Sequence, residues 1–266
     1  MIHVGTLAQA RQTRQSFKMD GALLSHKSVI IGGPAGDTRH PNAFLIEQEP
    51  GRLLPAHFHG WGQFQVVVAG GGKLGTHELR PLTVHYAGQR SPYGPILPGD
   101  QGLWYLTLRP RTESGVFFMP ESRGFRDPAK IPRFDCVSEF HETAGTRDAT
   151  VSELRVDQIM PEKTVGLGAW LMRIPAHASA QAPSLPGGAG RYHVVVGGSL
   201  QQASAPLDWL SMIWSDADEA PLALQAGPRG AEVLILQFPG DACLHPHPDP
   251  ERTTLTSLVS RQSAAD

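Results

Sequence analysis

A strand followed by glycine occurs twice in this chain, and this repeat constrains the fold more than any other feature. Residues 63–71 (QFQVVVAGG) align without a gap on residues 191–199 (RYHVVVGGS). Further along, residues 95–110 parallel residues 221–239 with a small gap, and both stretches end in a strand followed by proline. Two matches in the same order and at about the same separation indicate an internal duplication.

Short runs rich in β-branched and aromatic residues recur along the whole chain, and most of them are bounded by Gly or Pro. The 29 glycines and 23 prolines among 266 residues suit many short strands joined by turns. We therefore predict an all-β fold. Residues 150–156 are consistent with either a short strand or a short helix.

Two histidines stand one residue apart just before the first copy of the repeat. His57 and His59 would point to the same face of a strand, because strand side chains alternate with period 2. Two imidazoles on one face can hold one metal ion. The surrounding glycines, Gly51 and Gly70, lie at fixed distances on either side.

Residues 51–70 resemble the first signature of the cupin family, which reads Gly, five residues, His-x-His, three or four residues, Glu, six residues, Gly. The chain matches every fixed position except the metal-binding Glu, where it has Gln63. With the duplication, the resemblance implies two tandem double-stranded β-helix barrels of jelly-roll type. We expect the first barrel in residues 1–125, a connector in 126–162, a second barrel in 163–242 and a tail in 243–266.

The two predicted barrels differ in their metal-binding potential. Aligning Arg191 on Gln63 places Leu185 and Gly187 opposite the two motif histidines, so the second barrel lacks both ligands. Any metal chemistry is therefore expected in the first barrel.

The cupin resemblance implies a divalent metal ion held by four protein ligands. Imidazole suits iron, manganese, nickel, copper or zinc. The family's second motif, Pro-x-Gly-x-x-His, is matched by residues 92–97 (PYGPIL), which place Leu97 or, counted from the following turn, Tyr93 at the histidine position. As replacements we expect His85, ahead of His77, with Gln63 as a weak ligand through its amide oxygen.

Such a three-histidine centre is associated in related cupins with oxygen-dependent bond cleavage. For substrate binding we name Tyr93, Trp61 and Gln65, with Tyr93 donating a hydrogen bond at the pocket mouth. Two functions are compatible with the sequence. The first is a metal-dependent cupin enzyme, an oxygenase acting on a small organic molecule. The second is a non-catalytic small-molecule-binding cupin without a functional metal.

Composition narrows the set of partners. The formal net charge of −2 gives no broad basic surface for nucleic acid or anionic lipid. The two cysteines, Cys136 and Cys243, form no C-x-x-C pair, so neither a disulfide framework nor a thiolate zinc site is predicted. No signal segment or long apolar run is present, and we expect a soluble cytoplasmic protein. The expected partner is a small-molecule ligand, and a homodimer is compatible with the sequence.

Overall fold

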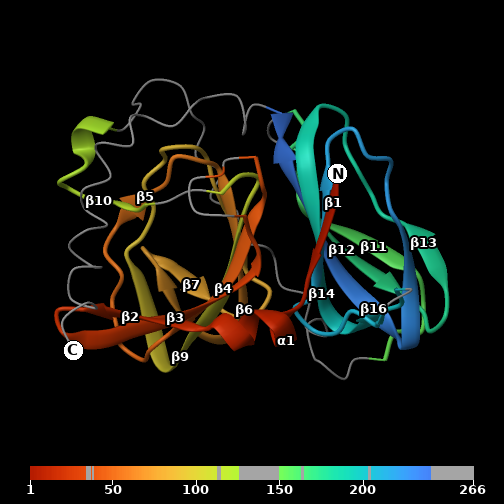
Figure 1. Cartoon of the computed structure of the whole chain (residues 1–266), viewed down its shortest axis with the longest axis horizontal. Helices are drawn as coiled ribbons and strands as arrows, with labels where there is room; N and C mark the ends of the chain where they lie inside the picture. Colours follow the sequence, from red (N-terminus) through yellow and green to blue (C-terminus); the bar gives the residue numbers. More distant parts are fainter. Residues whose placement is uncertain are drawn as a thin grey trace. The chain divides into compact units, whose positions relative to one another are not determined.

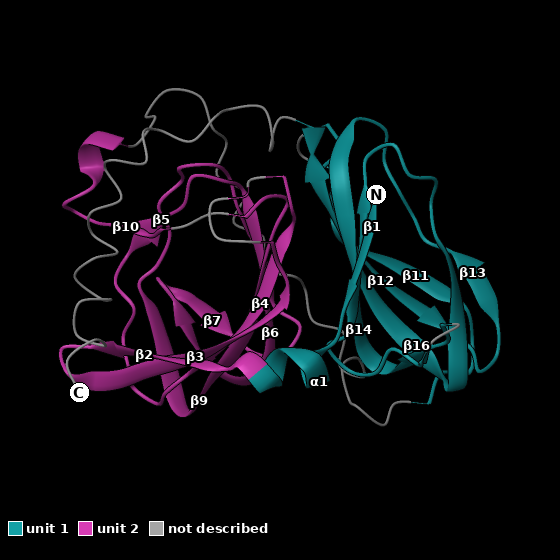
Figure 2. Ribbon diagram, in the orientation of Figure 1, with its two compact units in different colours: residues 1–12, 138–241 teal, residues 13–137, 242–266 magenta. Residues whose placement is uncertain are grey.

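The structure is a computed structural model that describes residues 1–33, 37, 39–112, 115–125, 150–162, 165–202 and 205–240. The chain forms two compact units, residues 13–137 with 242–266 and residues 1–12 with 138–241 (Figure 2). We call the former the first barrel and the latter the second barrel. Most of the expected connector and all of the expected tail, with Cys136 and Cys243, lie outside the described residues.

The first barrel is built from antiparallel strands (Figure 1). Its main sheet has the order β2-β3-β4-β9-β6-β7, β8 also pairs with β6, and β5 pairs with β10 in a separate ladder. The elements are β2 (Gln15–Met19), β3 (Ala22–Ile31), β4 (Asn42–Gln48), β5 (His57–Phe58), β6 (Gln63–Leu74), β7 (His77–Leu79), β8 (Val84–Ala87), β9 (Ile96–Arg109), β10 (Phe117–Phe118) and a 3₁₀ turn at Arg123–Phe125.

The second barrel repeats this plan with the order β1-β15-β14-β16-β12-β11, and β13 pairs with β16. Its elements are β1 (Ile2–Gly5), α1 (Leu7–Ala10), β11 (Arg155–Met160), β12 (Gly168–Ile174), β13 (Ser179–Gln181), β14 (Gly188–Leu200), β15 (Met212–Asp216) and β16 (Ala223–Pro239), and a 3₁₀ turn follows α1 at Arg11–Thr13. The prediction of an all-β chain with two tandem barrels is confirmed.

Equivalent rows of the two barrels are related by a constant offset in residue number. Gln65 lies opposite His85 and Thr107 in the first barrel, and His193 lies opposite Ile213 and Ile235 in the second. Each of these positions differs by 128, since 193 − 65, 213 − 85 and 235 − 107 give the same number. The bulges after Val67 and Val195 obey the same offset. The predicted equivalence of strands 64–69 and 192–196 is therefore confirmed.

The glycine after each copy of the repeated segment lies inside a long strand, β6 or β14, and is required there for the same structural reason. Gly70 has φ +69° and Gly198 has φ +62°, a region that residues with a Cβ rarely adopt. A Cβ on Gly70 would strike the backbone oxygen of Gly102, and a Cβ on Gly198 would strike that of Gly230. Only glycine allows the long strands to cross this closely.

The observed units differ from the predicted boundaries at two places. β1, which was expected in the first barrel, pairs with β15 of the second barrel. β11, which was expected in the connector, pairs with β12 as a regular strand. Both are edge strands with several exposed residues, so their sequences lack the alternation of apolar and polar residues that predicts a strand.

The inner faces of the two barrels both contain an apolar cluster but differ in the polar residues beside it. On β6 the apolar residues Phe64 and Val66 are fully buried on one face, while Gln63 and Gln65 occupy the other. In the second barrel the corresponding inner face is mostly an apolar core that includes Trp170, Val195, Ile213 and Ile235. The inner face of β6 in the first barrel thus carries two neighbouring buried amide side chains, Gln63 and Gln65. In the described part of the chain, no helix has the length and hydropathy required to span a membrane.

Candidate ligand site

Both motif histidines are fixed by backbone carbonyls. His57 Nδ1 lies 2.8 Å from Pro55 O, and His59 Nδ1 lies 3.0 Å from Gly115 O. A carbonyl oxygen can only accept, so each Nδ1 carries the hydrogen and each Nε2 carries the lone pair. The β5–β10 ladder, in which His57 pairs with Phe118, holds this segment in place.

The two imidazoles line one cavity of about 280 Å³ inside the first barrel. Their ring centroids are 5.2 Å apart and the rings are nearly perpendicular. Burial lowers the pKa of His57 to about 4, although the bond to Pro55 acts in the opposite direction. Burial, followed by the charge of Arg109, lowers the pKa of His59 well below its usual range. Both side chains are therefore neutral at pH 7.

Gln63 occupies the position of the family's metal-binding Glu, but its oxygen is already engaged. Arg109 Nε donates to Gln63 Oε1 at 2.9 Å, and Gln63 Nε2 donates to the Tyr93 hydroxyl at 2.6 Å. A guanidinium has no acceptor atom, so the amide must turn its oxygen toward Arg109. The nitrogen is left on the tyrosine side, where it cannot bind a metal.

Tyr93 lies among the three candidate histidines, as the second register of the degenerate motif predicts. Its ring centroid is 4.5 Å from His57, 6.3 Å from His59 and 5.3 Å from His85. Two backbone hydrogen bonds tie Tyr93 to His57, at 3.0 and 2.9 Å. The structure thus brings Tyr93, Gln63 and the histidine pair together.

Of the other predicted site residues, only some line this cavity. Gln65 lines the cavity, and its Oε1 lies 3.0 Å from His85 Nδ1. His85 itself lines a separate small cavity of about 20 Å³ and is not among the residues that line the larger one. Trp61 is buried but does not line the larger cavity, and His77 is exposed on β7.

Cationic side chains form part of the cavity wall. Lys18, Lys27 and Arg109 line it, whereas no Asp or Glu in the described ranges does. Lys27 Nζ lies 4.1 Å and the Arg109 guanidinium carbon 5.4 Å from the ring centroid of Phe44, which places the ring within reach of both charges. Burial, with the nearby charge of Arg109, lowers the pKa of Lys27 to about 8.

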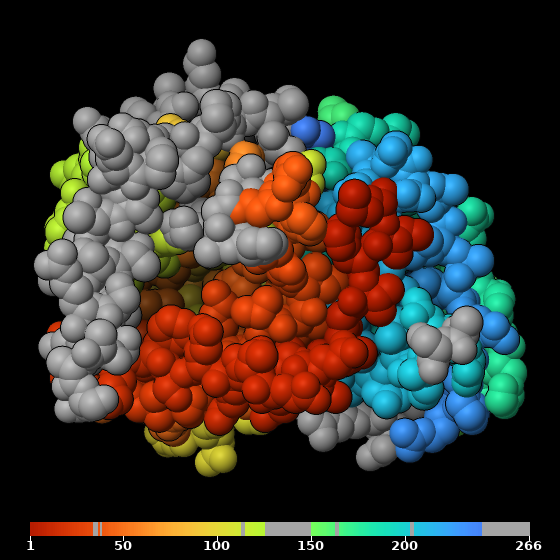
Figure 3. Space-filling model, in the orientation of Figure 1, coloured from red at the N-terminus to blue at the C-terminus, as the bar shows by residue number. Residues whose placement is uncertain are grey.

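Apolar side chains make up much of the rest of the wall, and several come from β2, β3 and β4. The principal ones are Phe17, Met19, Leu24, Phe44, Ile46 and Phe118. Figure 3 shows the outer side of β2 and β3 in red and orange. The cavity therefore combines cationic, imidazole and apolar side chains in one lining.

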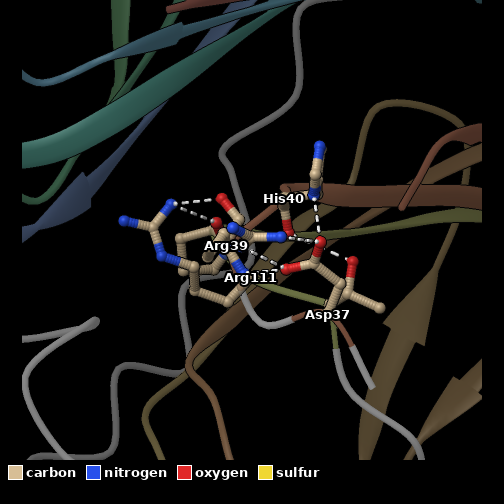
Figure 4. A network of polar contacts seen from close by, with 6 residues as sticks. Asp37, Arg39, His40 and Arg111 are labelled. Atoms are coloured by element: carbon tan, nitrogen blue, oxygen red, sulfur yellow. Dashed lines mark hydrogen bonds and ion pairs between the residues drawn. The ribbon is translucent and has the colours of Figure 1, made fainter. Parts of the chain in front are cut away.

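A polar network outside the cavity fixes the loops around β4 and β9 (Figure 4). Arg39 donates to Asp37 from its backbone N, Nε and Nη2, at 2.9 to 3.0 Å. These bonds hold the pKa of Asp37 well below its usual range. The N–H and hydroxyl of Thr112 both donate to His40 O, at 2.7 and 3.1 Å. The network thereby ties residues 37, 39 and 40 to the residues that follow β9, up to Thr112.

The residues present do not fit a resident divalent metal of the expected kind. Within the described ranges, no group of three or more His, Cys, Asp or Glu side chains is arranged to hold a metal ion. The pair of His57 and His59 supplies two nitrogen donors, but the amide oxygen of Gln63 faces Arg109 instead. Cationic neighbours also disfavour a bound cation. The three-histidine centre remains a prediction that this donor set argues against.

Sequence reasoning missed Lys27 and Arg109, which dominate the electrostatics of the cavity. A signal was available for Arg109, because strand alternation puts it on the same face as Tyr105 and Thr107. A charge at an inward position of an apolar strand indicates a functional or structural role. Lys27 carries a weaker signal, since its strand β3 is only partly buried.

No protein-family model matches the sequence, and the search of curated proteins gives no match. Solved structures do match the fold. A Nostoc punctiforme protein with a provisional dioxygenase assignment is 10% identical, with a TM-score of 0.59 over 91% of this chain and 84% of its own.

Two further structures show the same architecture. An 11S globulin from Wrightia tinctoria, described as revealing an auxin-binding site, is 11% identical, with a TM-score of 0.57 over 90% of this chain and 83% of its own. Oxalate decarboxylase from Bacillus subtilis is 8% identical, with a TM-score of 0.53 over 90% of this chain and 77% of its own. One study of that enzyme concerns its Mn(II) centres. At such low identity these likenesses establish the cupin barrel fold alone.

Proposed function

We propose that the first barrel binds a small organic anion, a carboxylate with a compact apolar body, and does so without a resident metal. The observation that carries this proposal is the charge of the cavity wall, with Lys18, Lys27 and Arg109 and no carboxylate among the described lining residues. An anion would meet complementary charge on this wall.

Lys27 is the residue most directly available to the ligand. Its ammonium group makes no hydrogen bond or ion pair within the described part of the chain, and it lies over the ring of Phe44. Arg109, in contrast, is oriented by Gln63 and presents a fixed charge. His57 Nε2 can accept a hydrogen bond from a hydroxyl or amino group of the ligand.

The size of the ligand follows from the cavity. A volume of about 280 Å³ corresponds to roughly ten non-hydrogen atoms, at the ~30 Å³ that a liquid water molecule occupies. The Wrightia globulin supports the general point that this fold accommodates small organic ligands. Benzoate matches the size and charge, and its two relatives benzamide and benzylamine offer a neutral and a cationic group on the same ring.

The rival function is the metal-dependent cupin oxygenase expected from the sequence. The observation that favours it is the anchoring of both Nδ1 atoms on carbonyls, which puts the lone pair of each ring on Nε2, the atom that would coordinate a metal. The Nostoc and Bacillus structures add only the general point that enzymes use this fold. Elemental analysis of the purified protein distinguishes the two functions.

The test is calorimetric titration of chelator-treated protein with benzoate, benzamide and benzylamine. We expect binding of benzoate alone. Lys27→Met should weaken it about 10- to 150-fold, the ~1.5–3 kcal/mol of a hydrogen bond to a charged group. Lys73→Met is the matched control, because it removes an exposed lysine paired with Glu78 and leaves the cavity unchanged.

Affinity should also fall as pH rises through about 8, where Lys27 loses its proton. Equal affinity for benzoate and benzamide would refute the proposal. Stoichiometric metal in the purified protein, with ligand binding that is lost on chelation, would establish the metal-dependent rival in its place.

A further inference from the structure

An arginine and a glutamine have exchanged places between the two barrels. In the first barrel Gln63 on β6 contacts Arg109 on β9. In the second barrel Arg191 on β14 lies opposite Gln237 on β16, at the positions offset by 128. The row continues to Ser215 on β15, which also lies opposite Arg191.

The exchanged pair does not form the same hydrogen bond. Gln237 Oε1 accepts from Leu185 N at 3.1 Å, and its Nε2 donates to Gly166 O and Leu185 O at 2.9 Å each. All the amide atoms are therefore used by the neighbouring loops. Arg191 keeps one recorded hydrogen bond, from Nη2 to Glu219 O at 2.8 Å, and it makes no recorded ion pair with a described residue.

One polar atom of this arginine and two polar atoms of its neighbours are buried and have no hydrogen-bond partner. They are Arg191 Nε, His193 Nε2 and Ser215 Oγ. Their residues are 5%, 0% and 0% exposed. Arg191 and His193 are two apart on one strand, and Ser215 is directly across, so all three share one face, with neighbouring Cβ atoms about 4.5–8 Å apart.

Native proteins rarely leave such groups unsatisfied, and a buried guanidinium without an anion is especially costly. The guanidinium and the hydroxyl both offer donors. His193 Nδ1 lies 3.4 Å from Ile213 O, which can only accept, so the neutral ring carries its hydrogen on Nδ1, and Nε2 donates when the ring is protonated. Arg191 Nε and Ser215 Oγ thus supply two buried donors beside one positive charge, and a protonated imidazole supplies a third, a combination that suits an anion.

We propose that the second barrel binds one small anion, a halide or an oxyanion such as formate, between Arg191, His193 and Ser215. The anion takes the place that the glutamine side chain holds beside the arginine in the first barrel. This site is separate from the cavity of the first barrel and does not depend on the function proposed for that cavity.

Bromide is the direct probe. Crystals of the full chain grown in sodium bromide should show an anomalous peak about 3.2–3.5 Å from Arg191 Nε, near the usual hydrogen-bond range extended for a larger ion. An ordered water at that position in place of bromide, or filling of the position by protein atoms, would overturn the proposal.

Thermal unfolding in increasing formate provides the solution test. It is carried out on Lys27→Met protein, so that the first-barrel cavity contributes little. The melting temperature should rise with formate concentration, and the added change Arg191→Met should abolish the rise. Arg155→Met, which removes an exposed arginine of the same barrel, should retain it.

Ser215→Ala provides a second variant if Arg191→Met does not fold, and it should weaken the formate effect several-fold. A rise that is unchanged in both Arg191→Met and Ser215→Ala would contradict the assignment. The assignment would also be contradicted if the melting temperature of the Lys27→Met protein did not rise with formate at all.

Discussion

Placing a carboxylate at residue 63, where the cupin signature has Glu, should convert an anion site into a cation site. In Gln63→Glu the new carboxylate would face Arg109 at the 2.9 Å distance of the present amide. The Tyr93 hydroxyl, which now accepts from the amide, can rotate to donate to it. The substitution therefore changes charge with little change in shape.

The magnitude follows from Coulomb's law. At an effective dielectric constant of ~20, a new negative charge about 7 Å from the ligand carboxylate costs roughly 2.4 kcal/mol, or about 50-fold in affinity. Calorimetric titration with benzoate measures this loss. At the same time the set of His57, His59 and a carboxylate should take up a divalent ion such as Mn²⁺ or Zn²⁺, measured by elemental analysis.

Gln101→Glu is the control, because it adds the same charge at an exposed position of β9 that does not line the cavity. It should leave benzoate affinity and metal content unchanged. The reasoning is refuted if Gln63→Glu binds benzoate as tightly as the parent protein, since the cavity charge would then be irrelevant to binding.

Two further predictions concern stability. Gly70→Ala and Gly198→Ala should each cost at least ~2 kcal/mol in urea unfolding, since each adds a backbone collision to the strain of a positive φ. Gly21→Ala has the strain without the collision and should cost only ~1 kcal/mol, and equal losses in all three would contradict the crossing argument. The second prediction concerns pH, because His57 takes up a proton near pH 4 in the folded protein and near pH 6.5 in the unfolded chain. The free energy of unfolding should therefore fall as the pH drops from 6.5 to 4, by about 3 kcal/mol from His57 alone. His59 adds to the fall in the same direction, and a flat stability profile between pH 7 and 4.5 would rule out buried neutral histidines.

The fold could be predicted largely from one repeated segment. The glycine after each copy is required where two long strands cross, so it marks the same point of both barrels in the sequence. The edge strands β1 and β11 could not be placed, because their partners lie elsewhere in the chain and their exposed residues carry little periodic signal.

The candidate site was predicted only in part, for a physical reason. The motif locates His57 and His59, and the structure places Tyr93 beside them. What the motif does not contain is the residue across the sheet, Arg109, which determines how Gln63 is oriented. Ligand identity depends on such cross-strand neighbours, and their pairing is a property of strand register rather than of local sequence.

The pairing of β1 with β15 makes the first barrel an insertion within the second. Ile2–Gly5 completes a sheet whose other strands begin only after the first barrel has been synthesised. On the ribosome strands β2 to β10 of the first barrel can pair early, while β1 must wait for residues 212–216 before it finds its partner. Cutting the chain near residue 150 would leave one edge of β15 without its strand, and an unpaired edge invites association with other chains. The second half is thus a discontinuous folding unit that depends on the first few residues of the sequence.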